Sequence, residues 1–148
     1  MPVPVNENIT LNVVTTVDAV TGITAERHDR KAATPAHMLA IIHEGADEKL
    51  GDDETPCGFS AWVRSYGVQV YIFQQDLADG VNFHTTLNTV RADIEKALMA
   101  DVTRGGYAHN TEIQSPQEFV DSNDATGVVV FFDVTYRTDQ YDPYEPAP

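Results

Sequence analysis

Histidine is the side chain in this sequence best suited to bind a metal, and it occurs five times. None of the histidines has a neighbour at the close spacing found in zinc-binding helices, and only His37 and His43 lie within six residues of each other. On a strand, these two side chains would lie on opposite or distant edges. We therefore expect structural histidines and no metal site. The five residues are His28, His37, His43, His84 and His109.

A second group of potential ligands is the acidic run from Asp47 to Glu54. Carboxylates are the ligands that calcium and magnesium prefer, but the run lacks the spaced Asp and Gly residues and the closing Glu of a calcium loop. A solvated surface loop is the favoured interpretation.

Cys57 is the only cysteine, which excludes an intramolecular disulfide and makes a reducing compartment the simpler assumption. The surrounding residues 55–59 do not resemble a nucleophile turn, so a small buried hydrophobic side chain is the favoured interpretation. The Gly-Gly pair at 105–106 follows a predicted helix, so its amides face the wrong end of that helix to bind phosphate. We expect no enzymatic activity and no cofactor.

The charge balance narrows the classes of partner. The chain has 23 acidic and 9 basic side chains, which gives a formal net charge of -14. Non-specific DNA binding needs clustered Lys and Arg, and the sequence has no such cluster. Residues Met1 to Glu7 lack the features of a signal peptide, and no apolar run approaches the roughly 18 residues that span a bilayer. We expect no sequence-specific nucleic-acid binding and no membrane association.

Apolar periodicity predicts two helices. The first is capped by Asn6 or Asn8 and ends near Gly22. Its apolar stripe consists of Ile9, Val13, Val17 and Val20. The second is capped by Asn82 and is stopped by the Gly-Gly pair at 105–106. Its stripe consists of His84, Leu87, Val90, Ile94 and Leu98.

Alternating and short apolar runs predict five strands. They cover residues 23–28, 38–43, 59–74, 107–113 and 126–136. The third carries apolar groups on both faces and is expected to be central, with a bulge or bend at Gly67. Between the strands, the polar stretches predict loops at 29–35, 44–56 and 115–124.

The order of these elements predicts an α+β fold with a mixed, mainly antiparallel β-sheet and two helices on one face. We expect one domain over residues 1–138 and a C-terminal arm over 139–148, which is rich in Pro, Tyr and acidic residues. The sheet face away from the helices would be apolar, and another subunit would be its natural cover. The candidates on this face are Tyr71, Phe73, Val129 and Phe131.

Two stretches resemble a known family. The first runs from Asp93 to Leu98 and on through the Gly-Gly pair into the strand 107–113, and the second is the closing strand 128–138 with Asp142-Pro143. Together they resemble the C-terminal half of tail terminator (tail completion) proteins of long-tailed bacteriophages, over roughly residues 62 to 144. The first half of the chain departs from that family in its Thr- and Val-rich helix and in its long acidic loop.

The resemblance implies a virion protein whose subunits close into a six-membered ring. In that family the ring caps the tail tube, ends its polymerisation and presents a face to the head connector. The implied partners are therefore further copies of this chain, the tail tube protein and a head connector or neck protein, after assembly in the host cytoplasm. DNA would pass through the ring lumen, where negative charge keeps it from sticking to the wall.

The C-terminal part of the chain supplies further interface candidates. Arg137, Asp139 and Asp142 could form a rim ion pair between neighbours, each contributing little at an exposed site. The aromatic, Pro-rich arm is suited to clasp the next subunit. The remaining candidates are Tyr136, Tyr141 and Tyr144.

Three other functions stay open at this point. A head-completion or neck protein of the same type of virus fits the same features. An acidic domain can also be a DNA mimic that occupies a basic cleft on an enzyme, although a mimic needs its acids on one face and these are spread over loops, helix and arm. A hydrolase that uses Cys57 or a histidine cluster is the least favoured.

Overall fold

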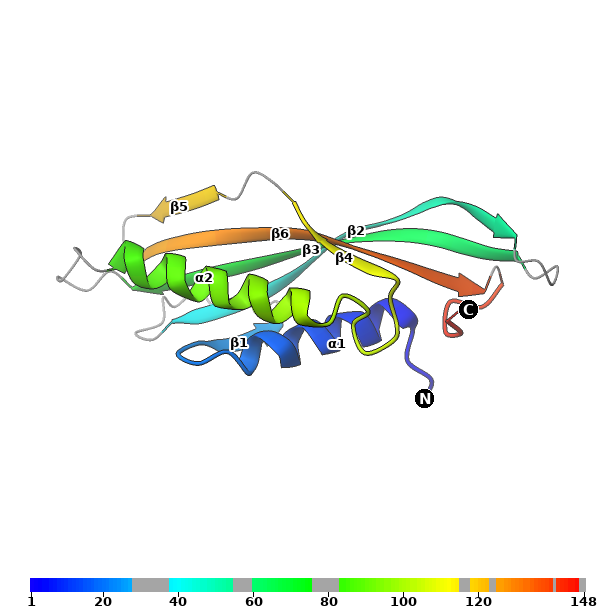
Figure 1. Ribbon diagram of the computed structural model, residues 1–148, viewed down its shortest axis with the longest axis horizontal. Helices are drawn as coiled ribbons and strands as arrows, with labels where there is room; N and C mark the ends of the chain where they lie inside the picture. Colours follow the sequence, from blue (N-terminus) through cyan, green and yellow to red (C-terminus); the bar gives the residue numbers. More distant parts are fainter. Residues whose placement is uncertain are drawn as a thin grey trace.

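The strands of this protein form one mixed β-sheet. The computed structural model describes residues 1–27, 38–54, 60–75, 83–114, 118–122, 125–139 and 141–146. The strands formed by these residues are β1 (Thr24–Arg27), β2 (Leu39–Glu54), β3 (Ser60–Gln75), β4 (Asn110–Ile113), β5 (Glu118–Ser122) and β6 (Ala125–Asp139). Their order is β1-β2-β3-β6-β4, with β5 also paired to β6, and only β1 and β2 run parallel among the described pairs (Figure 1). The predicted α+β class and the central position of β3 are confirmed.

The first helix, α1 (Val5–Asp18), begins one residue earlier than its expected asparagine cap. Pro4 precedes it with φ −57°, and no side chain caps the helix, so the prediction that Asn6 or Asn8 is the cap is wrong. Val5 is completely buried and is the first member of a stripe with a spacing of four residues, so the helix must start there to bury it. The other members of this stripe are Ile9, Val13 and Val17.

The second helix, α2 (Phe83–Ala100), buries four of the five side chains in its predicted stripe, and the fifth, that of His84, lies outside the described residues. The buried members are Leu87, Val90, Ile94 and Leu98. The helix ends before the Gly-Gly pair, because buried Arg104 donates its guanidinium Nη2 to the carbonyl oxygens of Leu98 and Asp101. Gly105 and Gly106, with φ of 72° and 92°, instead form the turn into β4, where glycine adopts left-handed backbone without strain.

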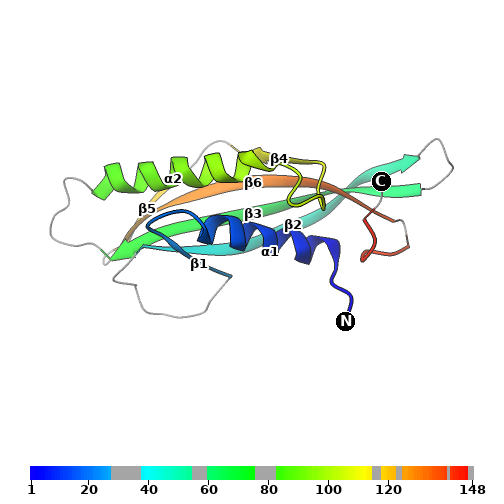
Figure 2. The ribbon, with the colours of Figure 1, turned by 60° about the horizontal axis from the view of Figure 1, so that its bottom comes forward.

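Both helices lie side by side on one face of the sheet (Figure 2). The side chains that β2, β3 and β6 contribute to the core alternate along each strand, as the two-residue period of a strand requires. They are Ala40, Ile42, Tyr66, Val68, Val70, Ile72, Val128, Val130, Phe132, Val134 and Tyr136. We call this the helix face of the sheet, and the opposite side the open face.

The acidic stretch predicted as a loop over 44–56 is wrong for residues 44–54, which continue β2. The long strand β3 offers a partner along this whole length, and two register shifts in β2 absorb the irregular pattern. One shift lies opposite Gly67, where Gly45 approaches closely: a Cβ on Gly45 would lie 2.8 Å from the Gly67 carbonyl oxygen. The expected bulge near Gly67 is therefore on the neighbouring strand.

The polar loop predicted over 115–124 is wrong where β5 forms. Residues Glu118–Ser122 pair antiparallel with the start of β6, from Glu118 opposite Val129 to Ser122 opposite Ala125. The predicted strand over 107–113 is shorter and begins at Asn110, after the turn. The loop predicted over 29–35, the capping residue Asn82 and Cys57 lie outside the described residues.

The C-terminal segment 141–146 follows β6 and is tied to the domain by its backbone. The Val5 amide donates to the Pro143 carbonyl oxygen at 3.1 Å, and the Asp139 amide donates to the Glu145 carbonyl oxygen at 3.0 Å. Pro146 also forms a bridge with Thr138. The arm thus turns back toward the start of α1, as the red trace in Figure 1 shows.

Within the described residues, neither helix is long and apolar enough to cross a membrane.

Candidate subunit interface

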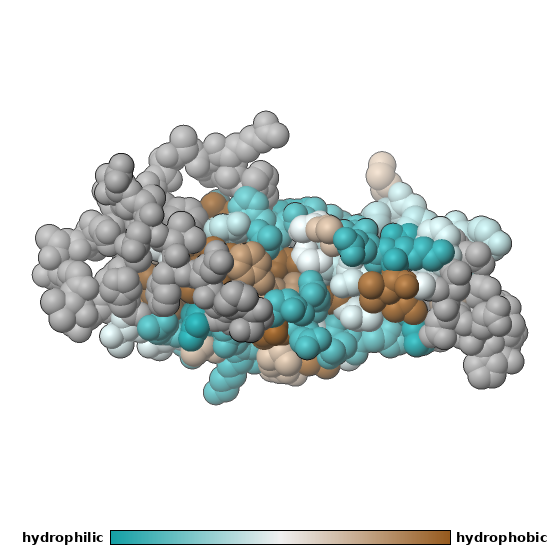
Figure 3. All heavy atoms as spheres, turned by 90° about the horizontal axis from the view of Figure 1, so that it is seen from above, coloured by the Kyte–Doolittle hydropathy of each residue, from teal (hydrophilic) through white to brown (hydrophobic). Residues whose placement is uncertain are grey.

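The open face of the sheet carries apolar side chains that neither helix covers. Its half-buried apolar and aromatic side chains include Leu39, Ile41, Tyr71 and Phe131. The ring of His43 meets that of Tyr71 edge-on, with centroids 4.7 Å apart, and the Tyr71 hydroxyl donates to Gln69 Oε1 at 2.9 Å. Figure 3 shows this face from above, with brown hydrophobic surface among teal hydrophilic residues.

The four residues predicted for this face fall in two neighbouring strands. Tyr71 pairs directly with Val129, so the structure brings these two together across β3 and β6. Phe131 lies two residues further along β6, and Val129 is 3% exposed. The backbone of Phe73 continues the same row of β3, but its side chain lies outside the described residues.

Tyr136 lies on the other side of the sheet from these residues. It is 2% exposed and belongs to the helix-face core. Arg137 and Asp139 alternate with it and lie half-buried on the open face, at the far end of β6. Tyr136 therefore serves the fold of its own subunit in this structure.

The last three candidates lie in the C-terminal segment and are exposed. Tyr141 is 88% exposed and Tyr144 is 45% exposed, and Asp142 is exposed between them. The Asp142 carboxylate accepts a hydrogen bond from the Tyr144 amide at 2.9 Å, and Asp139 accepts one from the Tyr141 amide at 2.8 Å. Short Asp turns of this kind present both tyrosines to solvent.

A row of three carboxylates crosses the open face beyond its apolar half. Asp133 of β6 pairs directly with Glu112 of β4, and Glu48 of β2 lies on the same face beyond Gly67. Burial raises the pKa of the Asp133 carboxyl above its ordinary value, and the negative charges of Glu112 and Glu48 raise it further. A partner that covers this part of the face must therefore tolerate or neutralise negative charge.

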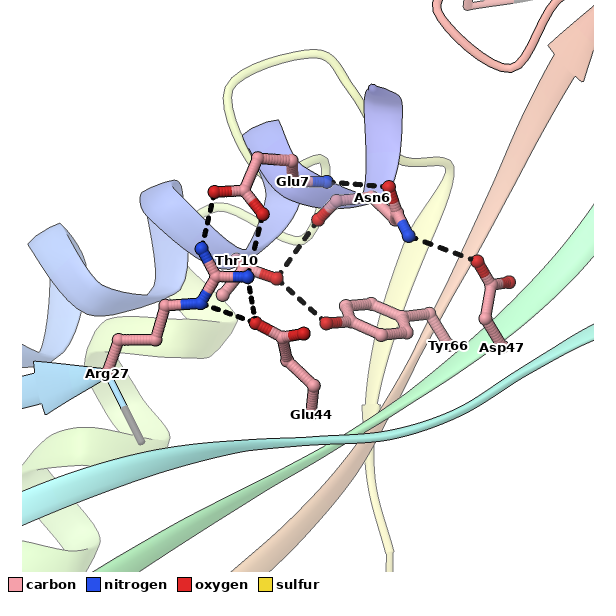
Figure 4. A network of polar contacts seen from close by, with 7 residues as sticks. All are labelled: Asn6, Glu7, Thr10, Arg27, Glu44, Asp47 and Tyr66. Atoms are coloured by element: carbon pink, nitrogen blue, oxygen red, sulfur yellow. Dashed lines mark hydrogen bonds and ion pairs between the residues drawn. The ribbon is translucent and has the colours of Figure 1, made fainter. Parts of the chain in front are cut away.

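A polar network fixes α1 against the sheet (Figure 4). Arg27, at the end of β1, pairs with Glu7 of α1 and with Glu44 of β2, and its Nη2 lies 2.7 Å from Glu7 Oε2. The hydrogen bond to Glu7, together with Glu44, raises the pKa of Arg27, which keeps the guanidinium charged. These side chains are partly exposed, so the network orients the elements more than it stabilises them.

Beside this network, a buried pair of hydroxyl groups joins the helix to β3. Thr10 donates to the Asn6 carbonyl oxygen at 3.0 Å, which leaves the Tyr66 hydroxyl to donate to Thr10 Oγ1 at 2.8 Å. Burial raises the pKa of Tyr66 to about 12. The pair lies where the apolar stripe of α1 meets the sheet, so it sets the depth of that contact.

Asp47 of β2 links the start of α1 to β6. Its Oδ2 accepts from the Tyr136 hydroxyl at 2.6 Å and from Asn6 Nδ2 at 3.4 Å, and Arg64 Nη1 lies 3.9 Å away. Burial raises the pKa of Tyr136, and the neighbouring Asp47 carboxylate raises it further. This acid, expected in a solvated loop, is thus a structural residue.

Two cations and one indole form a second cluster on the helix face, beyond the start of α1. Lys49 Nζ lies 4.4 Å from the ring centroid of Trp62, and the Arg64 guanidinium carbon lies 5.3 Å from it. The cluster arises because Lys49 pairs with Arg64 across β2 and β3, with Trp62 two residues further along. We call these three residues the Trp62 cluster.

The sequence pattern did not single out the polar network around Arg27 or the Trp62 cluster, because both depend on the pairing of elements that are distant in the chain. The chemistry of the described residues is that of contact surfaces: apolar, acidic and cation–aromatic. In this part of the chain, no group of three or more His, Cys, Asp or Glu residues could hold a metal ion.

Comparison with known proteins gives distant structural similarities. No protein-family model matches the chain, and no curated protein matches it. One solved structure, whose title states no function, has a TM-score of 0.44 and 10% sequence identity over 88% of this chain and 92% of the other. A second is titled as the virion of a native gene transfer agent particle, with a TM-score of 0.38 and 11% identity over 90% and 92%. Similarities at this level carry no functional conclusion.

Proposed function

We propose that this chain is a structural subunit of a long-tailed phage virion, a tail terminator that assembles into a ring at the end of the tail tube. The observation that carries the proposal is the open face of the sheet, where apolar and aromatic side chains lie in a row that the helices leave uncovered. Burial of such a face by a further copy removes apolar surface from water, which is the main driving force of association.

Three further features support the same function. The sequence of α2, the following turn and β6 resembles the tail terminator family. The exposed tyrosines of the C-terminal segment are amphipathic side chains of the kind that dominate subunit contacts. The net charge of -14 suits a ring through which DNA passes without binding. In this proposal the partners are further copies of this chain, the tail tube protein, and a head connector or neck protein.

The proposal is tested by native mass and by capping of tail tubes. Phe131→Asp places a charge on the open face, and we expect it to shift the purified protein from rings to monomers and to abolish binding to tube ends. The matched control is Asn88→Asp, which adds the same charge at an exposed position of α2. Circular dichroism should show that both variants keep the fold.

The outcomes separate the functions that the sequence leaves open. A wild-type protein that stays monomeric at all concentrations, also with tail tubes present, would contradict the proposal. Rings that bind isolated head connectors but not tail tubes would instead indicate a neck protein. Tight binding of the monomer to a DNA-binding enzyme would indicate a DNA mimic.

A further inference from the structure

The C-terminal segment 141–146 is held to its own subunit by few contacts. It makes backbone bonds to Val5 and Asp139 and a bridge to Thr138, whereas its side chains are exposed. Tyr141 has 88% of its surface in water, which is unusual for an aromatic residue in a folded segment. The segment therefore presents side chains that its own subunit does not use.

The surface beneath this segment has polar atoms that remain unsatisfied. Thr138, which pairs with Pro146, is 1% exposed, and its Oγ1 has no hydrogen-bond partner among the described residues. Trp62 is the cross-strand neighbour of Thr138, and its Nε1 is likewise buried without a partner in the described part of the chain. Leaving such a group unpaired is unfavourable, because the group loses its hydrogen bonds to water and gains none in the protein. The present position of the segment covers this surface without satisfying it.

Two of the unsatisfied groups at this surface are donors, and two cations, Lys49 and Arg64, lie beside them. Trp62 Nε1 and Arg64 Nε both carry a proton and find no acceptor within the residues that the structure describes, and Lys49 extends over the same indole ring. The C-terminal segment supplies the complementary chemistry, because Asp142 and Glu145 are exposed carboxylates. Charge-assisted hydrogen bonds between such groups are the stronger ones in proteins.

We infer that in the assembled ring the segment 141–146 of one copy lies over the Trp62 cluster of the next copy, with its carboxylates toward Lys49 and Arg64. The inference rests on the proposed function, because it needs a ring neighbour. Moving the segment onto a neighbour costs little, because among the described residues it gives up the backbone bonds to Val5 and Asp139 and the bridge to Thr138. The two prolines of the segment, Pro143 and Pro146, limit the conformational freedom that docking removes.

The exchange is tested by disulfide trapping between two differently substituted chains. Both chains carry Cys57→Ser, one also carries Tyr144→Cys, and the other also carries Lys49→Cys. After co-expression and mild oxidation, we expect a heterodimer joined between positions 144 and 49, identified by peptide mass. The matched control replaces Lys49→Cys by Asn88→Cys, at an exposed position of α2. The heterodimer with position 49 should exceed the control several-fold.

Charge reversal gives a second, independent measurement. Asp142→Lys with Glu145→Lys should weaken ring formation several-fold, and adding Lys49→Glu with Arg64→Glu in the same chain should restore most of it. Asp18→Lys with Asp93→Lys changes the net charge equally at exposed positions away from the cluster and should leave the ring intact.

The results distinguish failure of the exchange from failure of the proposed function. Intact rings with heterodimer only at the control level would overturn the exchange and leave the proposed function standing. Protein that never forms rings would overturn both. If the chain with Tyr144→Cys does not fold, Tyr141→Cys takes its place, since that side chain is even more exposed.

Discussion

Thr10 shows how a single hydroxyl group can join a helix to a sheet. Its side chain is completely buried and bonded to Tyr66, so Thr10→Val leaves the Tyr66 hydroxyl without an acceptor in the core. We expect the free energy of unfolding, measured with urea, to fall by about 1–3 kcal/mol. Thr15→Val is the control: it makes the same bond to the carbonyl four residues earlier, but it is exposed. An equal loss in both variants would show that helix propensity alone explains the effect.

Individual residues are also where sequence reasoning was least informative. The sequence did not single out Thr10, because its partner Tyr66 lies 56 positions away in β3. Arg104 gave no signal either, since a buried arginine that closes the end of α2 cannot be distinguished in sequence from a solvated one. By contrast, the core stripe of α2 was predictable, because it repeats locally with the helical period.

At the scale of elements, the close approach of Gly45 to Gly67 allows β2 and β3 to continue past a register shift. Gly45→Ala would place a Cβ 2.8 Å from a backbone oxygen that cannot move without the strand, so we expect a loss of about 1–3 kcal/mol in the free energy of unfolding. Gly51→Ala in the same strand meets nothing within 4 Å and is the matched control. A neutral Gly45→Ala would mean that the two strands separate here in solution.

The carboxylate row across β2, β6 and β4 gives the sheet a dependence on pH. The pKa of Asp133 is higher in the folded than in the unfolded chain, so the folded state binds the proton more tightly and its stability falls as pH rises from about 3.8 through the folded pKa. Asp133→Asn should therefore stabilise the protein at pH 7, by up to about 1 kcal/mol, as expected for relief of a cross-strand like-charge pair.

The pH profile of Asp133→Asn is the decisive measurement. Its gain over the wild type should disappear in thermal unfolding below about pH 3.8, where both states of the wild-type chain bind the proton. Asp93→Asn, an exposed acid of α2, should show no comparable gain. A gain that is independent of pH would contradict the assignment to ionisation.

The elements themselves were predictable where one pattern dominated. The alternating run of β6 and the long run of β3 were found because each has apolar side chains at every second position. The acidic half of β2 and the polar strand β5 were missed because they carry no such pattern and owe their conformation to pairing with β3 and β6. For the same reason the candidates on the open face were found only in the regular strands.

For the whole molecule, the C-terminal segment should matter for assembly and little for folding. Among the described residues the core cluster ends at Tyr136, so deletion of residues 141–148 removes none of the core side chains that the structure describes. We expect unchanged secondary structure by circular dichroism, a decrease of about 1 kcal/mol or less in unfolding free energy from the lost Val5 bond, and a clear loss of rings by native mass. Rings of unchanged stability would show that the segment does not join subunits.

The ladder between β3 and β6 has a consequence for how the chain folds. Residues 76–124 separate the two strands, so the longest antiparallel pairing in the sheet closes over a wide sequence interval. Contacts of this kind form late, because the chain loses the entropy of loop closure before the new contacts stabilise the structure. During synthesis the edge of β3 that pairs with β6 therefore stays unpaired until residues 125–139 leave the ribosome. In this interval the nascent chain is most exposed to aggregation and to chaperones.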